Sequence, residues 1–237
     1  MKIVEYVREQ SGAKSVLATK CFSTWSVFNL MSRYMDGTTS SSVYEARLGY
    51  EKFGKEVHAY SVVFSKKDIL DVSVFADKVI FNSVSQLKTL RKYTKGKKLG
   101  LRLNPRVSYS HFNLADPARR YSRLGVIGKK PLSEVLKYIS GVMFHFNCEN
   151  GDYGNFSSNI DYISERYKEI LPKLQWVSLG GGIYFTQKGY PLDKFCRKLK
   201  EFSKRFGVEV FLEPGESAIT QSGELVTSVL DIVHNEM

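Results

Sequence analysis

The 237-residue chain has few of the features that mark specialised protein classes. It contains three cysteines, too few and too scattered for a disulfide framework or a four-cysteine zinc site, at positions Cys21, Cys148 and Cys196. No run approaches 18 uninterrupted apolar residues, so no transmembrane helix is expected. Charged side chains at Lys2, Glu5, Arg8 and Glu9 interrupt the start of the chain, which therefore lacks the apolar stretch of a signal peptide. We expect a cytoplasmic protein.

Several motifs of metal and nucleophile chemistry are also missing. The four histidines lie far apart and no HExxH pair occurs, so no metal site is expected. There is no GxSxG turn of a serine hydrolase and no phosphate-binding loop ending in GK and a hydroxyl residue. Cofactor or substrate chemistry must come from another arrangement.

The charge is strongly one-sided, because 35 Lys and Arg against 24 Asp and Glu give a net charge of +11. Six of the cations cluster in KTLRKYTKGKK (88–98). The cluster is either a phosphate-contacting patch or a solvated helix end, where cations are favourable. No aromatic platform or nucleic-acid motif accompanies it, so the second interpretation is favoured and no nucleic-acid partner is expected.

What is present is an ordinary globular composition, with 43% hydrophobic and 25% charged residues. Eight short apolar or β-branched runs alternate with stretches of helical periodicity. The runs are SVLATK (15–20), TTSSSV (38–43), EVHAYSVV (56–63), DKVIFN (77–82), KLGLRLN (98–104), GVMFHFN (141–147), LQWVSLG (174–180) and VEVFLEP (208–214).

Alternation of strands and helices predicts parallel βαβ units, and runs that are apolar on both faces fit a covered sheet. Eight strands favour a closed (β/α)8 TIM barrel of the α/β class, formed as one domain over residues 1–237. The run 38–43 is the weakest strand. The stretch 104–125 contains two prolines and is too long for a simple loop, so a functional or flexible segment is expected there.

Helices are expected between these runs. The clearest candidates are amphipathic or carry terminal Pro and Gly signals, and they span 23–35, 42–54, 157–171, 191–207 and 216–233.

Active sites of such barrels lie at the carboxyl ends of the strands. The residues at those ends form an ordered set: Lys20, Asn82, Arg102 with Asn104, His145, Gly180 to Gly182, and Glu213-Pro214-Gly215-Glu216.

Each residue of the set also has a structural explanation. Lys20 is either a partly desolvated nucleophile or a surface lysine. The triple glycine either turns its amides toward a phosphate or forms a tight turn without a ligand. Glu213 needs a cation or hydrogen-bond donors, which a protonated pyridine nitrogen or Arg102 could supply. His145 alternates with two phenylalanines and is either a core residue or points into the barrel.

Taken together, the ordered set resembles the alanine-racemase-like family of pyridoxal-phosphate-dependent decarboxylases. The stretches ATKCFSTWSVF, FHFNCEN, SLGGGIYFT and LEPGESA are similar, more narrowly, to the branch that acts on carboxylated polyamines such as carboxynorspermidine. The resemblance covers essentially the whole chain and implies pyridoxal 5'-phosphate as cofactor and a polyamine-type substrate.

The resemblance also implies roles for individual residues. Lys20 matches the lysine that binds the cofactor covalently, and His145 matches the histidine stacked on its ring. Gly180, Gly181, Gly182 and Gly215 match the backbone amides around the phosphate. Glu213 matches the carboxylate that pairs with the ring nitrogen, and Arg102 matches an arginine near the ring.

One departure from the family concerns length. Members continue past the barrel into a C-terminal β-rich domain that completes the site of a neighbouring subunit, whereas this sequence covers the barrel portion. The resemblance therefore implies a homodimer or a partner chain that supplies the missing part. A non-catalytic pyridoxal-phosphate carrier of single-barrel type and a nucleic-acid-binding module are the alternative functions.

Overall fold

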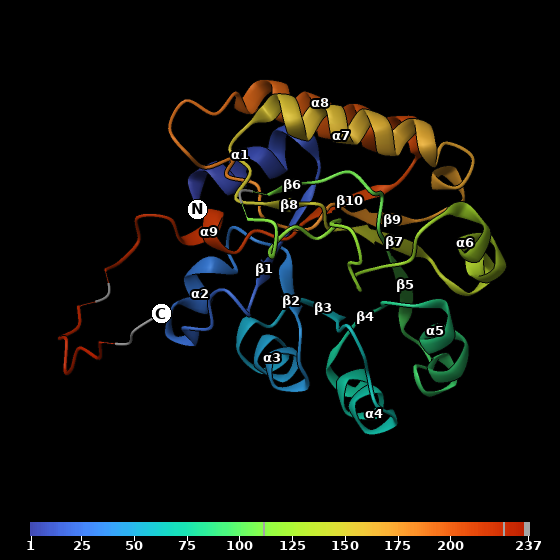
Figure 1. The fold of residues 1–237 in the computed structure, drawn as a ribbon, viewed down its shortest axis with the longest axis horizontal. Helices are drawn as coiled ribbons and strands as arrows, with labels where there is room; N and C mark the ends of the chain where they lie inside the picture. Colours follow the sequence, from blue (N-terminus) through green and yellow to red (C-terminus); the bar gives the residue numbers. More distant parts are fainter. Residues whose placement is uncertain (111, 225, 235–237) are drawn as a thin grey trace.

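Eight parallel strands close into a barrel in the order β1-β10-β9-β7-β5-β4-β3-β2, with helices around the outside (Figure 1). The computed structural model describes residues 1–110, 112–224 and 226–234. The barrel strands are β1 (Lys14–Ala18), β2 (Gly37–Ser40), β3 (Glu56–Tyr60), β4 (Lys78–Phe81), β5 (Lys98–Leu103), β7 (Gly141–Phe144), β9 (Trp176–Ser178) and β10 (Glu209–Leu212). All eight expected strands are therefore confirmed, including the weakest one.

Helices alternate with the strands along the chain, beginning with one that precedes β1. They are α1 (Lys2–Ser11), α2 (Phe28–Met31), α3 (Val43–Leu48), α4 (Lys66–Phe75), α5 (Val84–Leu90), α6 (Lys129–Val135), α7 (Tyr153–Arg166), α8 (Leu192–Phe206) and α9 (Glu216–Ile219). Ser65 and Asp68 form a reciprocal capping box at the start of α4. Gly207 ends α8 in the left-handed conformation, as the sequence indicated.

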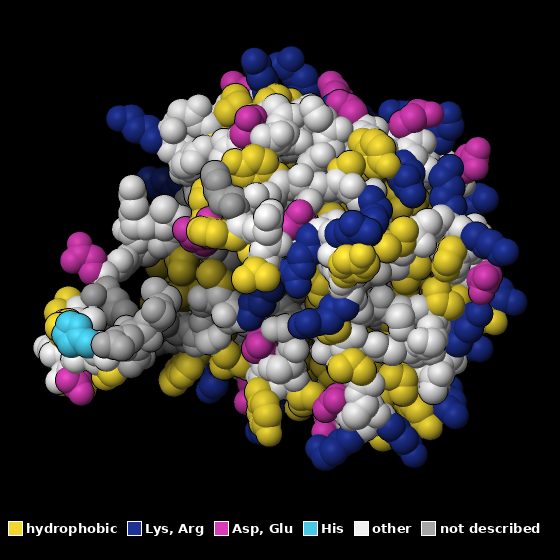
Figure 2. All heavy atoms as spheres, in the orientation of Figure 1, with side chains coloured by type: hydrophobic (Ala, Val, Ile, Leu, Met, Phe, Trp, Pro, Cys, Tyr) yellow, Lys and Arg dark blue, Asp and Glu magenta, His cyan; other side chains and the backbone are white. Residues whose placement is uncertain are grey.

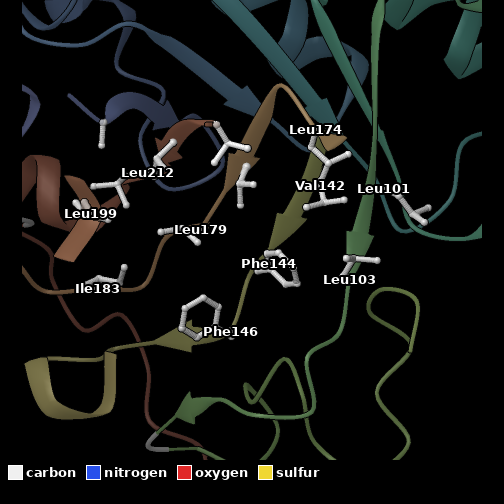
Figure 3. Packing of buried hydrophobic residues seen from close by; sticks show 14 of the residues in the cluster. Leu101, Leu103, Val142, Phe144, Phe146, Leu174, Leu179, Ile183, Leu199 and Leu212 are labelled. Carbon is white, nitrogen blue, oxygen red and sulfur yellow. The ribbon is translucent and has the colours of Figure 1, made fainter. Parts of the chain in front are cut away.

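Two layers of apolar side chains fix the barrel. The outer layer packs strand residues such as Val142, Phe144 and Leu212 against helices, and Figure 3 shows part of it. The barrel interior is filled by a smaller cluster of Val16, Ile80, Met143, Trp176 and Phe211.

Trp176 fills the interior because two neighbouring strands offer it glycines. A Cβ atom placed on Gly100 of β5 would lie 2.5 Å from the Trp176 ring, and one on Gly141 of β7 would lie 2.1 Å from it. Both distances are too short for real contacts, so the ring occupies the space that side chains on β5 and β7 would need.

Charged groups lie inside the barrel toward the amino ends of the strands, opposite to the end where the sequence places the active site. Lys78 is 1% exposed and pairs with Glu56, and its ammonium lies 4.3 Å from the centre of the Phe211 ring. Burial lowers the pKa of Lys78 to about 7, against the opposing charge of Glu209. His58 is fully buried beside Phe211, with a ring-centre distance of 4.7 Å.

The predicted segment 104–125 is indeed largely irregular. It contains the two-residue strand β6 (Tyr109–Ser110), which pairs with β8 (Asn147–Cys148) in a small separate sheet above the barrel. This second sheet was not expected, because strands of two residues leave no periodic pattern.

The predicted helix over 216–233 is wrong beyond its first turn. Helix α9 ends at Ile219, and residues 226–234 have no regular secondary structure. Val226 and Leu230 are 90% and 95% exposed. An amphipathic stripe forms a stable helix only when its apolar face packs on something, and this stripe has no such surface in the described residues.

The basic cluster agrees with the solvated-helix interpretation. Lys88 pairs with Glu134 at 2.9 Å and the Arg91 guanidinium lies 4.0 Å from the centre of the Tyr138 ring. Lys and Arg side chains are spread over the visible face rather than gathered in one stripe (Figure 2). Within the described residues, no helix combines the length and the apolarity needed to cross a bilayer.

Candidate active site

A cavity of about 610 Å³ opens among the segments that follow the carboxyl ends of the barrel strands. Seven of the eight predicted site residues line it, namely Lys20, Arg102, His145, Gly181, Gly182, Glu213 and Gly215. Residues far apart in the chain meet there because parallel strands end at the same edge of a barrel.

Lys20 lies two residues beyond the end of β1, in a turn that faces the cavity. Its side chain is exposed, which agrees with the surface-lysine interpretation rather than with a partly desolvated one. An exposed amine at the cavity wall is free to reach a carbonyl group of a bound molecule.

Glu213 is 7% exposed and is held by two hydroxyl groups. Ser178 Oγ donates to Glu213 Oε1 at 2.5 Å, and Thr39 Oγ1 donates to Oε2 at 3.5 Å. The alternative Glu213–Arg102 ion pair is absent from the described residues. A buried carboxylate that faces a cavity without a protein cation fits a positively charged ligand group.

Arg102 lies at the inner face of β5 and is 5% exposed. Its guanidinium lies 4.8 Å from the centre of the Tyr60 ring, which also lines the cavity. This cation–π contact orients the arginine along the cavity wall.

His145 follows β7 directly, and Gly181 N donates a hydrogen bond to its Nδ1 at 3.3 Å. Burial, together with the nearby charges of Arg102 and Lys20, lowers the pKa of His145 well below its ordinary value. The ring is therefore a neutral, flat surface at neutral pH.

The glycines of the site leave no room for side chains. A Cβ on Gly182 would lie 2.3 Å from Asn147 O, and one on Gly215 would lie 2.6 Å from Cys21 Cβ. Gly180 and Gly182 also have φ angles of +70° and +75°. The glycine run is required for the backbone to pass this close to its neighbours.

The amides of the triple glycine are not equivalent. Gly180 N donates to Ser178 Oγ at 3.2 Å and Gly181 N donates to His145, so both are committed within the protein. In the described residues, the Gly182 and Gly215 amides have no such partner. The resemblance placed all four glycines around a phosphate. In the part of the chain that the structure describes, the Gly180 and Gly181 amides bind protein side chains, and only the Gly182 and Gly215 amides remain available to a ligand.

The cavity also has an acidic side, of which the sequence analysis placed only Glu216 among the strand-end residues. Tyr184 donates its hydroxyl proton to Glu216 Oε2 at 2.8 Å. Burial, this hydrogen bond and the charges of Glu216 and Glu149 raise the pKa of Tyr184. The three residues come from the segments that follow β8, β9 and β10, so no motif brings them together in the sequence.

Two predicted strand-end residues serve the long segment instead of the cavity. Asn82 Oδ1 accepts hydrogen bonds from Tyr60 Oη at 2.9 Å and Gly125 N at 2.7 Å. Asn104 Oδ1 accepts from Arg106 N, and its Nδ2 donates to Leu124 O. Both asparagines hold the segment 104–125, which places Ala115, Pro117 and Leu124 on the cavity wall.

The described residues contain no group of three or more His, Cys, Asp or Glu side chains that could hold a metal ion. No family model matches the chain.

Comparison with known proteins gives a consistent result. The chain is 50% identical over 235 residues to a carboxynorspermidine/carboxyspermidine decarboxylase of Herminiimonas arsenicoxydans, covering 99% of this chain and 64% of that protein. A counterpart from Campylobacter jejuni is 35% identical and is covered to 61%. This chain is similar to the carboxynorspermidine/carboxyspermidine decarboxylases over less than two thirds of their length.

Solved structures agree with the sequence matches. Carboxynorspermidine decarboxylase from Campylobacter jejuni, solved with norspermidine, superimposes with a TM-score of 0.87 at 34% identity, over 99% of this chain and 61% of that one. Diaminopimelate decarboxylase from Helicobacter pylori shares the fold, with a TM-score of 0.78 at 18% identity. The resemblance and the barrel fold are thereby confirmed. The chain spans less than two thirds of the length of the carboxynorspermidine decarboxylases it matches.

Proposed function

We propose that this chain is the cofactor-binding barrel of a decarboxylase that releases carbon dioxide from carboxynorspermidine or carboxyspermidine in polyamine biosynthesis. The proposal takes its substrate class from the names of the relatives. It takes its chemistry from one observation, the buried Glu213 carboxylate that faces the cavity without a cationic partner. The same similarity favours a decarboxylase over the carrier alternative.

The residues present fit pyridoxal 5'-phosphate. A protonated ring nitrogen would supply the cation that Glu213 lacks. The Gly182 and Gly215 amides lie at a part of the wall from which any Cβ is excluded, which suits a closely approaching phosphate. His145 presents a neutral ring of the kind that can lie flat against a heterocycle. Each contact uses a group that the described protein leaves available.

Roles in the reaction follow from these positions. The cofactor, when bound, supplies the electron sink into which the bond to the leaving carboxylate breaks. Lys20 would hold it covalently through Nζ and exchange with the substrate amine. Glu213 would keep a proton on the ring nitrogen by charge, and Arg102 would add positive charge at the wall.

Further parts of the proposal concern the assembled enzyme. As the resemblance implies, we propose that the barrel of residues 1–237 forms one domain and works in a homodimer or together with a partner chain. All three cysteines are unpaired, which is typical of a cytoplasmic protein.

Absorbance spectroscopy tests the cofactor assignment. The chain mixed with pyridoxal 5'-phosphate should show the visible band of lysine-bound cofactor, and Lys20→Ala should lose it. Lys188→Ala, at an exposed position that does not line the cavity, should keep the band. Identical spectra for wild type and Lys20→Ala would remove the assignment.

Carbon dioxide release tests the activity separately. Carboxynorspermidine added to the assembled enzyme should release carbon dioxide in proportion to the lysine-bound cofactor. If the second subunit or partner chain is present and the cofactor band is normal but no carbon dioxide is released, the carrier alternative would be favoured.

A further inference from the structure

Ser178 connects the glycine turn to the carboxylate that faces the cavity. It is the last residue of β9 and is completely buried. Its Oγ accepts a hydrogen bond from Gly180 N at 3.2 Å and donates one to Glu213 Oε1 at 2.5 Å. The contact therefore belongs to the interior of the site rather than to its surface.

The direction of the Ser178 hydroxyl proton follows from elementary chemistry. A backbone N–H can only donate, so Ser178 Oγ must be the acceptor of the Gly180 bond. A hydroxyl has a single proton, which is then directed to the one remaining partner, the Glu213 carboxylate. The donor to an ionised acceptor makes a stronger bond than a neutral pair.

The backbone supports this arrangement from the other side. Glu213 N donates to Gly180 O at 2.9 Å, and a Cβ on Gly181 would lie 2.3 Å from Glu213 O. The glycine turn and Glu213 are thus joined through both main chain and side chain, which fixes the position of the carboxylate relative to the cavity.

We propose that Ser178 is the positioning residue of Glu213 and that the Gly180 amide sets the direction of its hydroxyl bond. The inference rests on the proposed function only for the identity of the cation that Glu213 faces. Thr39 makes a weaker, second contribution, because its Oγ1 lies 3.5 Å from Oε2.

The next amide of the turn, Gly181 N, fixes the position of a proton on His145 in the same way. Gly181 N must donate to His145 Nδ1, so a neutral His145 carries its proton on Nε2. Two consecutive amides of one turn therefore orient the protons of two side chains in the site. This explains why the first two glycines are not available to a phosphate.

A double-mutant cycle on the cofactor-free full chain tests the proposal. Urea unfolding at pH 7 is measured for wild type, Ser178→Ala, Glu213→Gln and the double variant. Ser178→Ala should raise the unfolding equilibrium constant by roughly tenfold more in the wild-type background than in the Glu213→Gln background, since only the former loses a bond to a charged acceptor. An equal effect in both backgrounds would overturn the proposal.

Ser15→Ala is the matched control. Ser15 is also fully buried in a barrel strand, but its hydroxyl has no hydrogen-bond partner among the described residues. Its effect should be the same in both backgrounds. Thr39→Val should couple to Glu213 more weakly than Ser178→Ala, and a stronger coupling would contradict the assignment of Ser178 as the main donor.

Two further measurements keep the test independent of how well Ser178→Ala folds. Ser178→Thr keeps the hydroxyl. Its effect on the unfolding equilibrium constant should therefore differ much less between the wild-type and Glu213→Gln backgrounds than the effect of Ser178→Ala does. In the wild-type chain, the Ser178 hydroxyl proton should give a slowly exchanging, downfield NMR signal, and rapid exchange would count against the proposal. None of these readouts involves the cofactor, so their failure is distinguishable from failure of the absorbance test.

Discussion

The Gly181 amide and His145 Nδ1 lie 3.3 Å apart, and this one bond decides which form of the imidazole faces the cavity. With Nδ1 occupied as an acceptor, a proton can sit only on Nε2 in the neutral ring. Burial and two nearby cations act in the same direction, because they disfavour a second proton.

We expect His145 to stay neutral at pH 6.5, where an ordinary histidine is half protonated. The 15N NMR shifts of the ring should show a protonated Nε2 and an unprotonated Nδ1 throughout the neutral range. The exposed His234 serves as the internal reference in the same spectra. A protonated Nδ1 at neutral pH would contradict the assignment.

The second prediction concerns acid stability and His58. Burial lowers the pKa of His58 from 6.5 to about 4, with nearby carboxylates opposing the shift. The unfolded chain therefore binds a proton that the folded chain refuses, so stability is complete above pH 6.5 and falls as the pH drops toward 4. The loss from this residue alone is about 3 kcal/mol.

His58→Phe should flatten that part of the pH profile, since an aromatic ring is kept and the titrating group is removed. Urea unfolding between pH 4 and pH 7 measures the free energies of unfolding. His234→Gln, on the exposed terminal segment, is the control and should retain the wild-type slope. A slope unchanged by His58→Phe would refute the prediction.

The third prediction separates two costs at a glycine. Gly182 and Gly12 both have φ +75°, but only Gly182 has neighbours within contact distance of an added Cβ. Gly12→Ala should cost about 1 kcal/mol of unfolding free energy, which is the penalty for the left-handed conformation. Gly182→Ala should cost about 1–3 kcal/mol more because the Cβ collides with the Asn147 carbonyl. Equal costs would show that the backbone at Gly182 relaxes freely.

The fourth prediction concerns the attachment of the long segment. Asn82→Ala leaves the Gly125 amide and the Tyr60 hydroxyl without their acceptor, at a cost of about 2 kcal/mol. Hydrogen exchange of the Gly125 amide should accelerate, and the segment 104–125 should become more sensitive to protease. Asn113→Ala, at an exposed position in the same segment, should leave both measurements unchanged.

Much of this molecule can be predicted from its sequence because parallel barrels impose a simple rule. The apolar runs indicate where the chain enters the barrel, and the residues at the carboxyl ends of the strands must converge. This rule alone places Lys20, His145 and Glu213 at one end of the barrel, where all three line the cavity. Even the polar run that forms β2 is placed correctly by its position in the alternation.

The rest depended on geometry that periodicity does not encode. To predict the pairing of Tyr184 with Glu216, one must know how the segments after β9 and β10 lie relative to each other. To predict the role of Ser178, one must know which face of β9 its side chain occupies. Asn82 occupies a strand end like Lys20, yet it supports a loop instead of lining the cavity. The prediction of a helix beyond Ile219 is wrong because helical periodicity shows that one face could pack, but not that a surface is there to pack against.

The tryptophan in the barrel interior has a consequence for how this sequence can vary. Trp176 occupies the volume above Gly100 and Gly141, so neither glycine can gain even a methyl group while the indole remains. A smaller residue at 176 would in turn leave a void that only larger residues at 100 and 141 could fill. Substitutions at positions 100, 141 and 176 are therefore expected to be tolerated only in combination. A library randomised at all three sites should return compensated triplets far more often than single replacements.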